Sequence, residues 1–147
     1  MKLYRFSPIQ NQDELLEAVK YIHFACYKLC KQSFGKYLPN AGNAGVFCHY
    51  DEEYDKLVGI RKQLTELSED PKQKYFKLHE PIVIETKDDI PETTYTYLYI
   101  RKPDIYRAQV GDIDFYLEQK EYHELKKSLQ GGKKVKVPAC SRAVTSN

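Results

Sequence analysis

The sequence lacks several features that would assign it quickly to a class of protein. It contains no tryptophan, and its four cysteines form no CxxC pair. Widely separated cysteines are typical of reduced thiols, so the sequence does not predict a disulfide framework. The 23 basic and 21 acidic side chains nearly cancel, and this balance excludes a broad electrostatic attraction to nucleic acid or to an anionic membrane.

Long apolar runs are also missing. None approaches the roughly 18 residues that a membrane-spanning helix needs, and residues 1–10 lack the apolar core of a secretory signal. We therefore expect a soluble cytoplasmic protein without membrane association. With 147 residues, 41% of them apolar, the chain can bury the core of one ordinary domain. We expect a single α+β domain over residues 1–137 and a disordered tail over 138–147.

Three segments have the signals of helices. The first is predicted over residues 12–33, with Asn11 as its cap and Glu14 placed to reach back to the cap amide. The second is predicted to have Asp51 as its cap, and the third is predicted over residues 121–129. The apolar stripes of the first two helices consist of Leu15, Val19, Ile22, Cys26 and Leu29, and of Leu57, Ile60, Leu64 and Leu67.

The remaining periodic segments alternate as strands do. They lie at residues 2–6, 45–50, 75–85, 94–102, 110–118 and 133–137, and residues 36–45 read as a loop rich in Pro, Asn and Gly. Because short loops separate the third, fourth and fifth runs, we expect these three to form an antiparallel meander. The sequence therefore predicts an α+β fold with a mixed, mainly antiparallel sheet, about three helices and the order β-α-β-α-β-β-β-α-β.

Two aspartates in the fifth strand are the first candidates for a functional site. Asp112 and Asp114 are two residues apart, so both side chains point to one face and can jointly hold a divalent metal. The motif GDIDF at residues 111–115 resembles the DxD strand of the nucleotidyltransferase superfamily, where such aspartates bind magnesium and a helix follows.

That resemblance covers residues 101–137 and implies phosphoryl transfer with Mg²⁺ as the cofactor. The family's Gly-Ser pair is missing before Asp112, and the segment KKVKV at 133–137 offers lysines where the family has a further carboxylate. The alternative interpretation is an alternating strand with one solvent-exposed face and no cofactor, and we favour it.

A nuclease motif is a second hypothesis for metal chemistry. Pro103-Asp104 followed by Glu118-Gln119-Lys120 matches the loose spacing of PD-(D/E)xK nucleases. The glutamate and the lysine of that motif belong inside an apolar strand, whereas here they lie where the strand gives way to a helix. Glu118 is explained equally well as an acidic residue in the first turn of that helix, where the helix dipole favours it.

Histidine and cysteine also occur together in the first predicted helix. His23, Cys26 and Cys30 lie near one helix face, and Cys48 or His49 from the next strand can complete a zinc site. Cys26, however, lies within the apolar stripe, where a free cysteine behaves as a small hydrophobic residue. Core packing is therefore the favoured interpretation.

Two segments of the chain share a layout. Gly45, Tyr50 and Tyr54 match Gly111, Tyr116 and Tyr122 if the second copy carries two extra residues. Repeated modules of this kind resemble the plan of the glyoxalase-like (vicinal oxygen chelate) superfamily, whose curved sheet encloses a metal or a small ligand. The resemblance implies a small-ligand-binding fold, although only about seventeen residues follow the second helix, where the plan places three strands.

Tyrosine is the most distinctive residue type, with 13 copies. Tyr95, Tyr97, Tyr99 and Arg101 alternate along one predicted strand and are expected to form a row on one face. Such rows bind protein partners and line ligand pockets, and they can also stack the bases of single-stranded nucleic acid. Given the balanced charge, we expect a binding or regulatory module for a protein partner or a small ligand, with nucleic acid less favoured.

Overall fold

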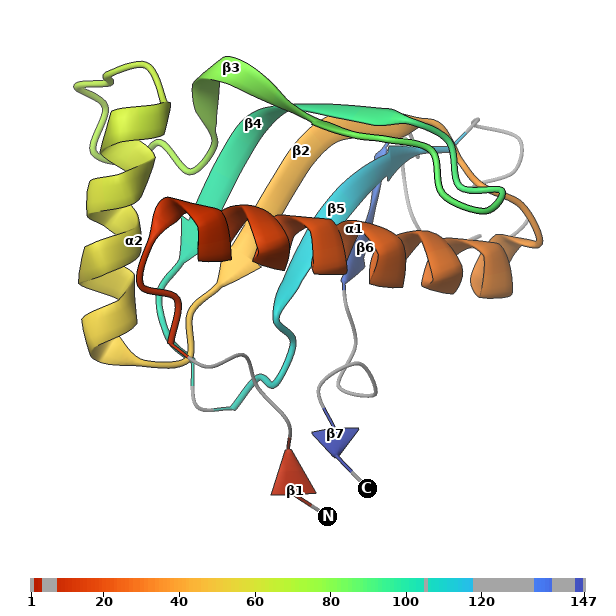
Figure 1. Cartoon of the computed structure of the whole chain (residues 1–147), viewed down its shortest axis with the longest axis horizontal. Coiled ribbons are helices and arrows are strands. Elements are labelled where there is room, and N and C mark those ends of the chain that lie inside the picture. Colours follow the sequence, from red (N-terminus) through yellow and green to blue (C-terminus); the bar gives the residue numbers. More distant parts are fainter. Residues whose placement is uncertain (1, 4–7, 105, 118–133, 139–144, 147) are drawn as a thin grey trace.

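The structure is a computed structural model that describes residues 2–3, 8–104, 106–117, 134–138 and 145–146. Its main sheet has the strand order β3-β4-β2-β5-β6, with one helix lying across it and a second helix standing beside β3 and β4 (Figure 1). The elements are α1 (Gln12–Phe34), β2 (Asn40–Phe47), α2 (Asp51–Leu64), β3 (Phe76–Ile84), β4 (Thr93–Arg101), β5 (Gly111–Tyr116) and β6 (Lys134–Pro138).

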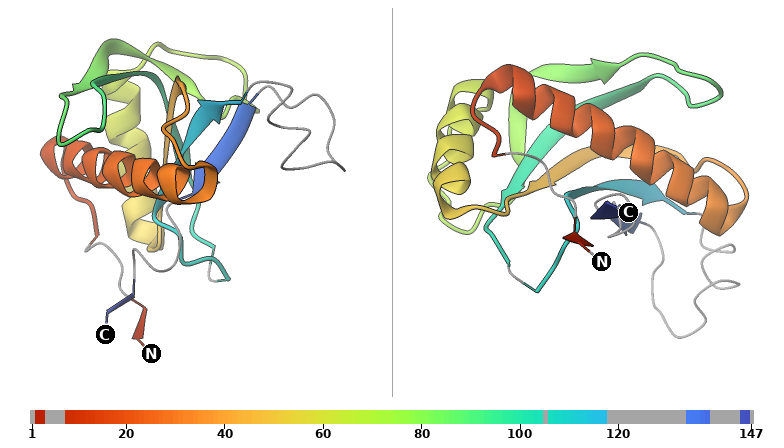
Figure 2. Two further views of the ribbon diagram at one scale, coloured as in Figure 1. Left: turned by 90° about the vertical axis from the view of Figure 1, so that its right-hand side faces the viewer. Right: turned by 60° about the horizontal axis from the view of Figure 1, so that its bottom comes forward.

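A separate pair of short strands joins the two ends of the chain. β1 (Lys2–Leu3) pairs antiparallel with β7 (Thr145–Ser146), and the left view of Figure 2 shows this pair apart from the main sheet. The third predicted helix, at residues 121–129, lies outside the described residues. In the described part of the chain, neither helix combines the length and the apolar character of a membrane-spanning segment.

The α+β class and the mixed sheet are confirmed, but the predicted meander is wrong. β3 and β4 are antiparallel neighbours, whereas β5 does not touch β4. β2 lies between them, parallel to β4 and antiparallel to β5. Loop lengths alone suggested adjacent strands, but the glycine-rich and alanine-rich strand β2 fits the centre of the sheet, where its small side chains leave room for its neighbours.

The prediction of a loop at residues 36–45 is wrong for its second half, because β2 begins at Asn40. Gly42 adopts the left-handed conformation, with φ of 81°, and its amide donates to the Asn40 side chain. The register between β2 and β5 shifts here, as expected for a bulge. A sequence typical of a turn therefore forms a bulged strand.

The first helix is confirmed over nearly its whole predicted length. Asn11 accepts a hydrogen bond from the Glu14 amide at 2.9 Å, while the Glu14 carboxylate accepts from Gln10 rather than from the cap residue itself. Gly35 ends the helix in the left-handed conformation, as a C-terminal glycine does. Its apolar stripe packs on the sheet, with Leu15, Val19, Ile22 and Cys26 fully buried.

The second helix differs from its prediction at both ends. Tyr50 rather than Asp51 is the cap residue, and it makes no capping hydrogen bond with its side chain. Leu67 lies beyond the helix and is exposed. Glu53, which the apolar pattern did not single out, is buried and accepts hydrogen bonds from the backbone amides of Ile9 and His49. This carboxylate ties the segment before α1 to α2.

Candidate binding site

The two faces of the main sheet have different surroundings. α1 covers one face, where Gly111, Ile113 and Phe115 of β5 are buried. No described helix lies across the opposite face, which carries Tyr97 and Tyr99 of β4, and we call it the open face. Tyr97 is 39% exposed, and Tyr99 is partly exposed.

The structure divides the predicted tyrosine row between the two faces. Tyr97, Tyr99 and Arg101 lie on the open face, but Tyr95 is 0% exposed and lies under α1. The change of side coincides with the register shift between β3 and β4, which falls between Lys77 and Ile82. Strict alternation along β4 therefore does not extend back to Tyr95.

Tyr95 belongs to a polar network inside the core. Its hydroxyl lies 2.8 Å from Nδ1 of His23 and accepts a hydrogen bond from the Asn40 amide at 3.1 Å. Beside it, the hydroxyls of Tyr27 and Thr93 are 3.0 Å apart. Burial lowers the pKa of His23 to about 4 and raises the pKa of Tyr95. Both groups are therefore uncharged at neutral pH, and the network is a structural link between α1 and the sheet.

Asp112 and Asp114 share the open face, as the alternation predicts, but they are not solvated. Their exposed fractions are 3% and 1%. The Asp114 carboxylate accepts a hydrogen bond from the side-chain Nδ2 of Asn43 at 3.1 Å. Asp112 fills the space above Gly45, where its Oδ1 atom would be 2.6 Å from an added Cβ. The favoured expectation of a solvent-exposed strand face is therefore wrong for these two carboxylates.

A hollow of about 670 Å³ lies over the open face, and we call it the arginine cavity. Four aromatic side chains line it, namely Phe47, Tyr75, Tyr99 and Tyr106. The ring centres of Tyr75 and Tyr99 are 5.3 Å apart, and the ring centres of Phe47 and Tyr99 are 6.5 Å apart.

The charged residues of the arginine cavity are mostly basic. Among the described residues, Lys74, Arg101 and Arg107 line it together with one carboxylate, that of Asp112. Arg107 forms an ion pair with Asp104 in the turn after β4, with Nε 3.4 Å from the carboxylate. Among the described lining residues, basic groups therefore outnumber carboxylates three to one, and Asp104 offsets part of the charge of Arg107.

Arg101 is the most constrained of these basic groups. Its guanidinium carbon lies 3.6 Å from the centre of the Phe47 ring, which is the geometry of a cation–π contact. The Nε and Nη2 atoms are buried and have no hydrogen-bond acceptor among the described residues. Burial, followed by the positive charge of Arg107, lowers the pKa of Arg101.

The chain matches no protein-family model, no curated protein and no solved structure. The site must therefore be interpreted from its own geometry. Within the described residues, no three His, Cys, Asp or Glu side chains gather as metal ligands. A magnesium site at Asp112 and Asp114 would need a further ligand from outside that part of the chain.

The zinc and nuclease sites considered from the sequence are also incomplete in the described part of the chain. Cys26, Cys30 and Cys48 are buried, and burial raises the pKa of Cys48 to about 12, which opposes the thiolate that zinc requires. Asp104 of the nuclease motif is engaged with Arg107. The glutamate and lysine of that motif, and the second half of the glyoxalase-like layout, lie outside the described residues.

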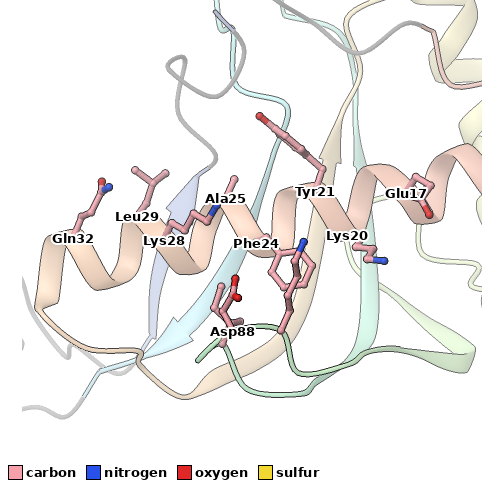
Figure 3. Close-up of a pocket in the computed structure, with 11 residues that line it drawn as sticks. Glu17, Lys20, Tyr21, Phe24, Ala25, Lys28, Leu29, Gln32 and Asp88 are labelled. Carbon is pink, nitrogen blue, oxygen red and sulfur yellow. The ribbon is translucent and has the colours of Figure 1, made fainter.

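A second hollow of about 550 Å³ runs along the outer surface of α1. Figure 3 shows Phe24, Ala25 and Leu29 of α1 in its wall, with Asp88 from the turn between β3 and β4 opposite them. In the described part of the chain, none of its lining residues carries a buried polar atom without a partner. This hollow, which we call the α1 groove, offers no group aimed at a specific ligand.

Strand alternation predicts Tyr99, Arg101 and Asp112 as candidate site residues, but not the other residues of the cavity. Phe47 and Tyr75 belong to predicted strands, whereas Tyr106 and Arg107 lie outside every predicted element. The pattern that could have revealed Phe47 is its pairing with Arg101 in the parallel ladder of β2 and β4. The predicted meander places β4 beside β5, so it does not predict the pairing of β2 with β4.

Proposed function

We propose that this protein is a binding module for a small molecule and that the arginine cavity is its binding site. The observation that carries this proposal is a concave site of about 670 Å³ with four aromatic side chains and a few convergent charged groups. Ligand sites in proteins have this composition, with apolar walls for affinity and sparse polar groups for orientation. The buried, stacked guanidinium of Arg101 is held ready for a ligand group.

Two alternatives from the sequence remain hypotheses. Phosphoryl transfer at Asp112 and Asp114 depends on a metal ligand from outside the described residues. A protein partner would use the rim of the open face, where Tyr97 is 39% and Tyr116 is 49% exposed. The arginine cavity favours a small molecule because its volume of about 670 Å³ suits a small ligand, whereas a protein interface needs a broad surface.

Filling the arginine cavity should abolish binding of small aromatic compounds. Ala108 lines this cavity, and Ala25 lines the α1 groove, so Ala108→Trp and Ala25→Trp insert the same ring into the two hollows. Both alanines are partly buried against the core, which makes the two variants comparable in stability cost. We expect aromatic fragments, detected by ligand-observed NMR, to bind the wild type and Ala25→Trp but not Ala108→Trp.

Saturation transfer with a mixed set of neutral, cationic and anionic fragments makes this test independent of ligand charge. Fragment signals that persist in Ala108→Trp and vanish in Ala25→Trp would show that the fragments bind in the α1 groove instead. No signal with any fragment in the wild type would contradict the proposal. A thermal melt of each variant identifies any loss of binding that results from unfolding.

A further inference from the structure

One edge of the Arg101 guanidinium has no hydrogen-bond acceptor within the part of the chain that the structure describes. Nε and Nη2 lie on the same edge, the one that makes two parallel hydrogen bonds with a carboxylate or a phosphate group. Both atoms are buried and lack an acceptor among the described residues. A buried charged donor without an acceptor is costly, so such an edge calls for an explanation. A ligand with two neighbouring oxygens would accept the hydrogen bonds of both donors.

The orientation of Arg101 is set before any ligand arrives. The face of the guanidinium packs on Phe47 at 3.6 Å, and Phe47 and Arg101 are paired in neighbouring strands. Stacking on Phe47 fixes the plane of the group and therefore the plane in which its edge can donate hydrogen bonds. A donor pair that is already ordered loses little entropy on binding.

The surroundings favour an anion with an attached ring. Lys74 adds positive charge to the same cavity, and so does Arg107, whose charge Asp104 partly offsets. Asp112 carries the one carboxylate among the described lining residues. Tyr99 lies on the neighbouring ladder position, beside Gly45, and its ring is partly exposed. A planar ring can therefore pack beside Tyr99 while its charged substituent reaches Arg101.

We propose that the ligand of the arginine cavity is a small aromatic oxyanion, whose carboxylate or phosphate group binds the Nε–Nη2 edge of Arg101 through two hydrogen bonds. This inference rests on the proposed function, since it names the ligand class for the same site. Carboxylates and phosphates share the required pair of oxygens, and the experiment separates them.

The test compares benzoate, phenyl phosphate and benzamide by NMR titration of the isotope-labelled full chain. Benzamide has the shape of benzoate without its charge, so we expect it to bind at least about ten-fold more weakly. Arg101→Lys retains a positive charge but loses the paired donors, and we expect a loss of about ten-fold in affinity for the better oxyanion. Whichever of benzoate and phenyl phosphate binds with the higher affinity shows whether the ligand carries a carboxylate or a phosphate group.

Arg61→Lys is the matched control. Arg61 also stacks on a phenylalanine, with its guanidinium carbon 3.9 Å from the Phe76 ring, but it lies outside the arginine cavity. We expect this variant to bind both anions as the wild type does. Equal affinity for benzoate and benzamide, or equal affinity of wild type and Arg101→Lys, would overturn the inference and leave the small-molecule site in place. Absence of binding by all three compounds and by the neutral fragments would overturn the proposed function as well.

Discussion

Replacing Gly111 with alanine should lower the free energy of unfolding by about 3 kcal/mol or more, the range of a strongly overpacked core. A Cβ at this position would collide with the backbone carbonyl oxygen of Gly45 and with the Ile22 side chain. The carbonyl oxygen belongs to the backbone of the neighbouring strand, so β2 and β5 would have to move apart, while the Ile22 side chain of α1 would have to shift. Urea denaturation followed by circular dichroism measures the change.

Gly59→Ala is the control for the effect of the glycine replacement itself. Gly59 lies within α2 on its exposed side, and an added Cβ there would meet nothing within 4 Å. Alanine should stabilise that helix by about 0.5–1 kcal/mol, because glycine loses more conformational freedom in a helix interior. Opposite signs for the two variants support the close packing of β2, β5 and α1. A Gly111→Ala variant as stable as the wild type would contradict that arrangement.

Acidification from pH 6.5 to pH 4 should cost the fold about 3 kcal/mol through His23 alone. Burial lowers the pKa of His23 from 6.5 to about 4. Between these values the unfolded chain binds a proton at this residue and the folded chain does not. Stability from this group is therefore complete above pH 6.5, decreases as the pH falls, and reaches its full loss below pH 4.

Two variants distinguish the burial of His23 from its hydrogen bond with Tyr95 as the cause of this pH dependence. His23→Leu removes the titrating group, so the difference in unfolding free energy between it and the wild type should change by about 3 kcal/mol over that pH range. Tyr95→Phe removes the hydroxyl that lies 2.8 Å from His23 but leaves the ring buried, so the pH dependence should persist. If His23→Leu and the wild type respond to pH identically, His23 is not buried as described.

The helices show what sequence patterns can predict in this chain. Asn11, the apolar stripe and Gly35 are local signals, and they define α1 to within one residue at its C-terminal end. Glu53 could not be found in that way, because its partners are the amides of Ile9 and His49, which only the packing of α2 brings near.

The sheet shows where local patterns stop being sufficient. Alternation placed Tyr97 and Tyr99 on one face, but Tyr95 lies beyond a register shift that depends on how β3 pairs with β4. Similarly, Asn40 and Gly42 have the sequence signals of a turn, yet they form a bulged central strand between β4 and β5. Pairing between distant segments determines both outcomes, and no short window of the sequence contains it.

The arginine cavity could be predicted only in part for the same reason. Its Tyr99 and Arg101 came from alternation along one strand, whereas Phe47 and Arg107 come from elsewhere in the chain. The balanced total charge suggested no preference for anions, because the local excess of basic groups arises only when three separate segments come together.

The affinity of Asp112→Asn for benzoate, measured by NMR titration against the wild type, tests the central claim most directly. Asp112 lines the arginine cavity together with three basic residues, and asparagine keeps its shape while removing its negative charge. If the cavity binds an anion at Arg101, the substitution removes a repulsion between Asp112 and benzoate and should tighten benzoate binding by about three-fold or more.

A titration of the same two proteins with Mg²⁺ tests the alternative metal site. We expect no saturable Mg²⁺ binding to the wild type that is lost in Asp112→Asn. Weaker benzoate binding by Asp112→Asn, together with Mg²⁺ binding lost in that variant, would contradict the account and favour a metal site on the open face.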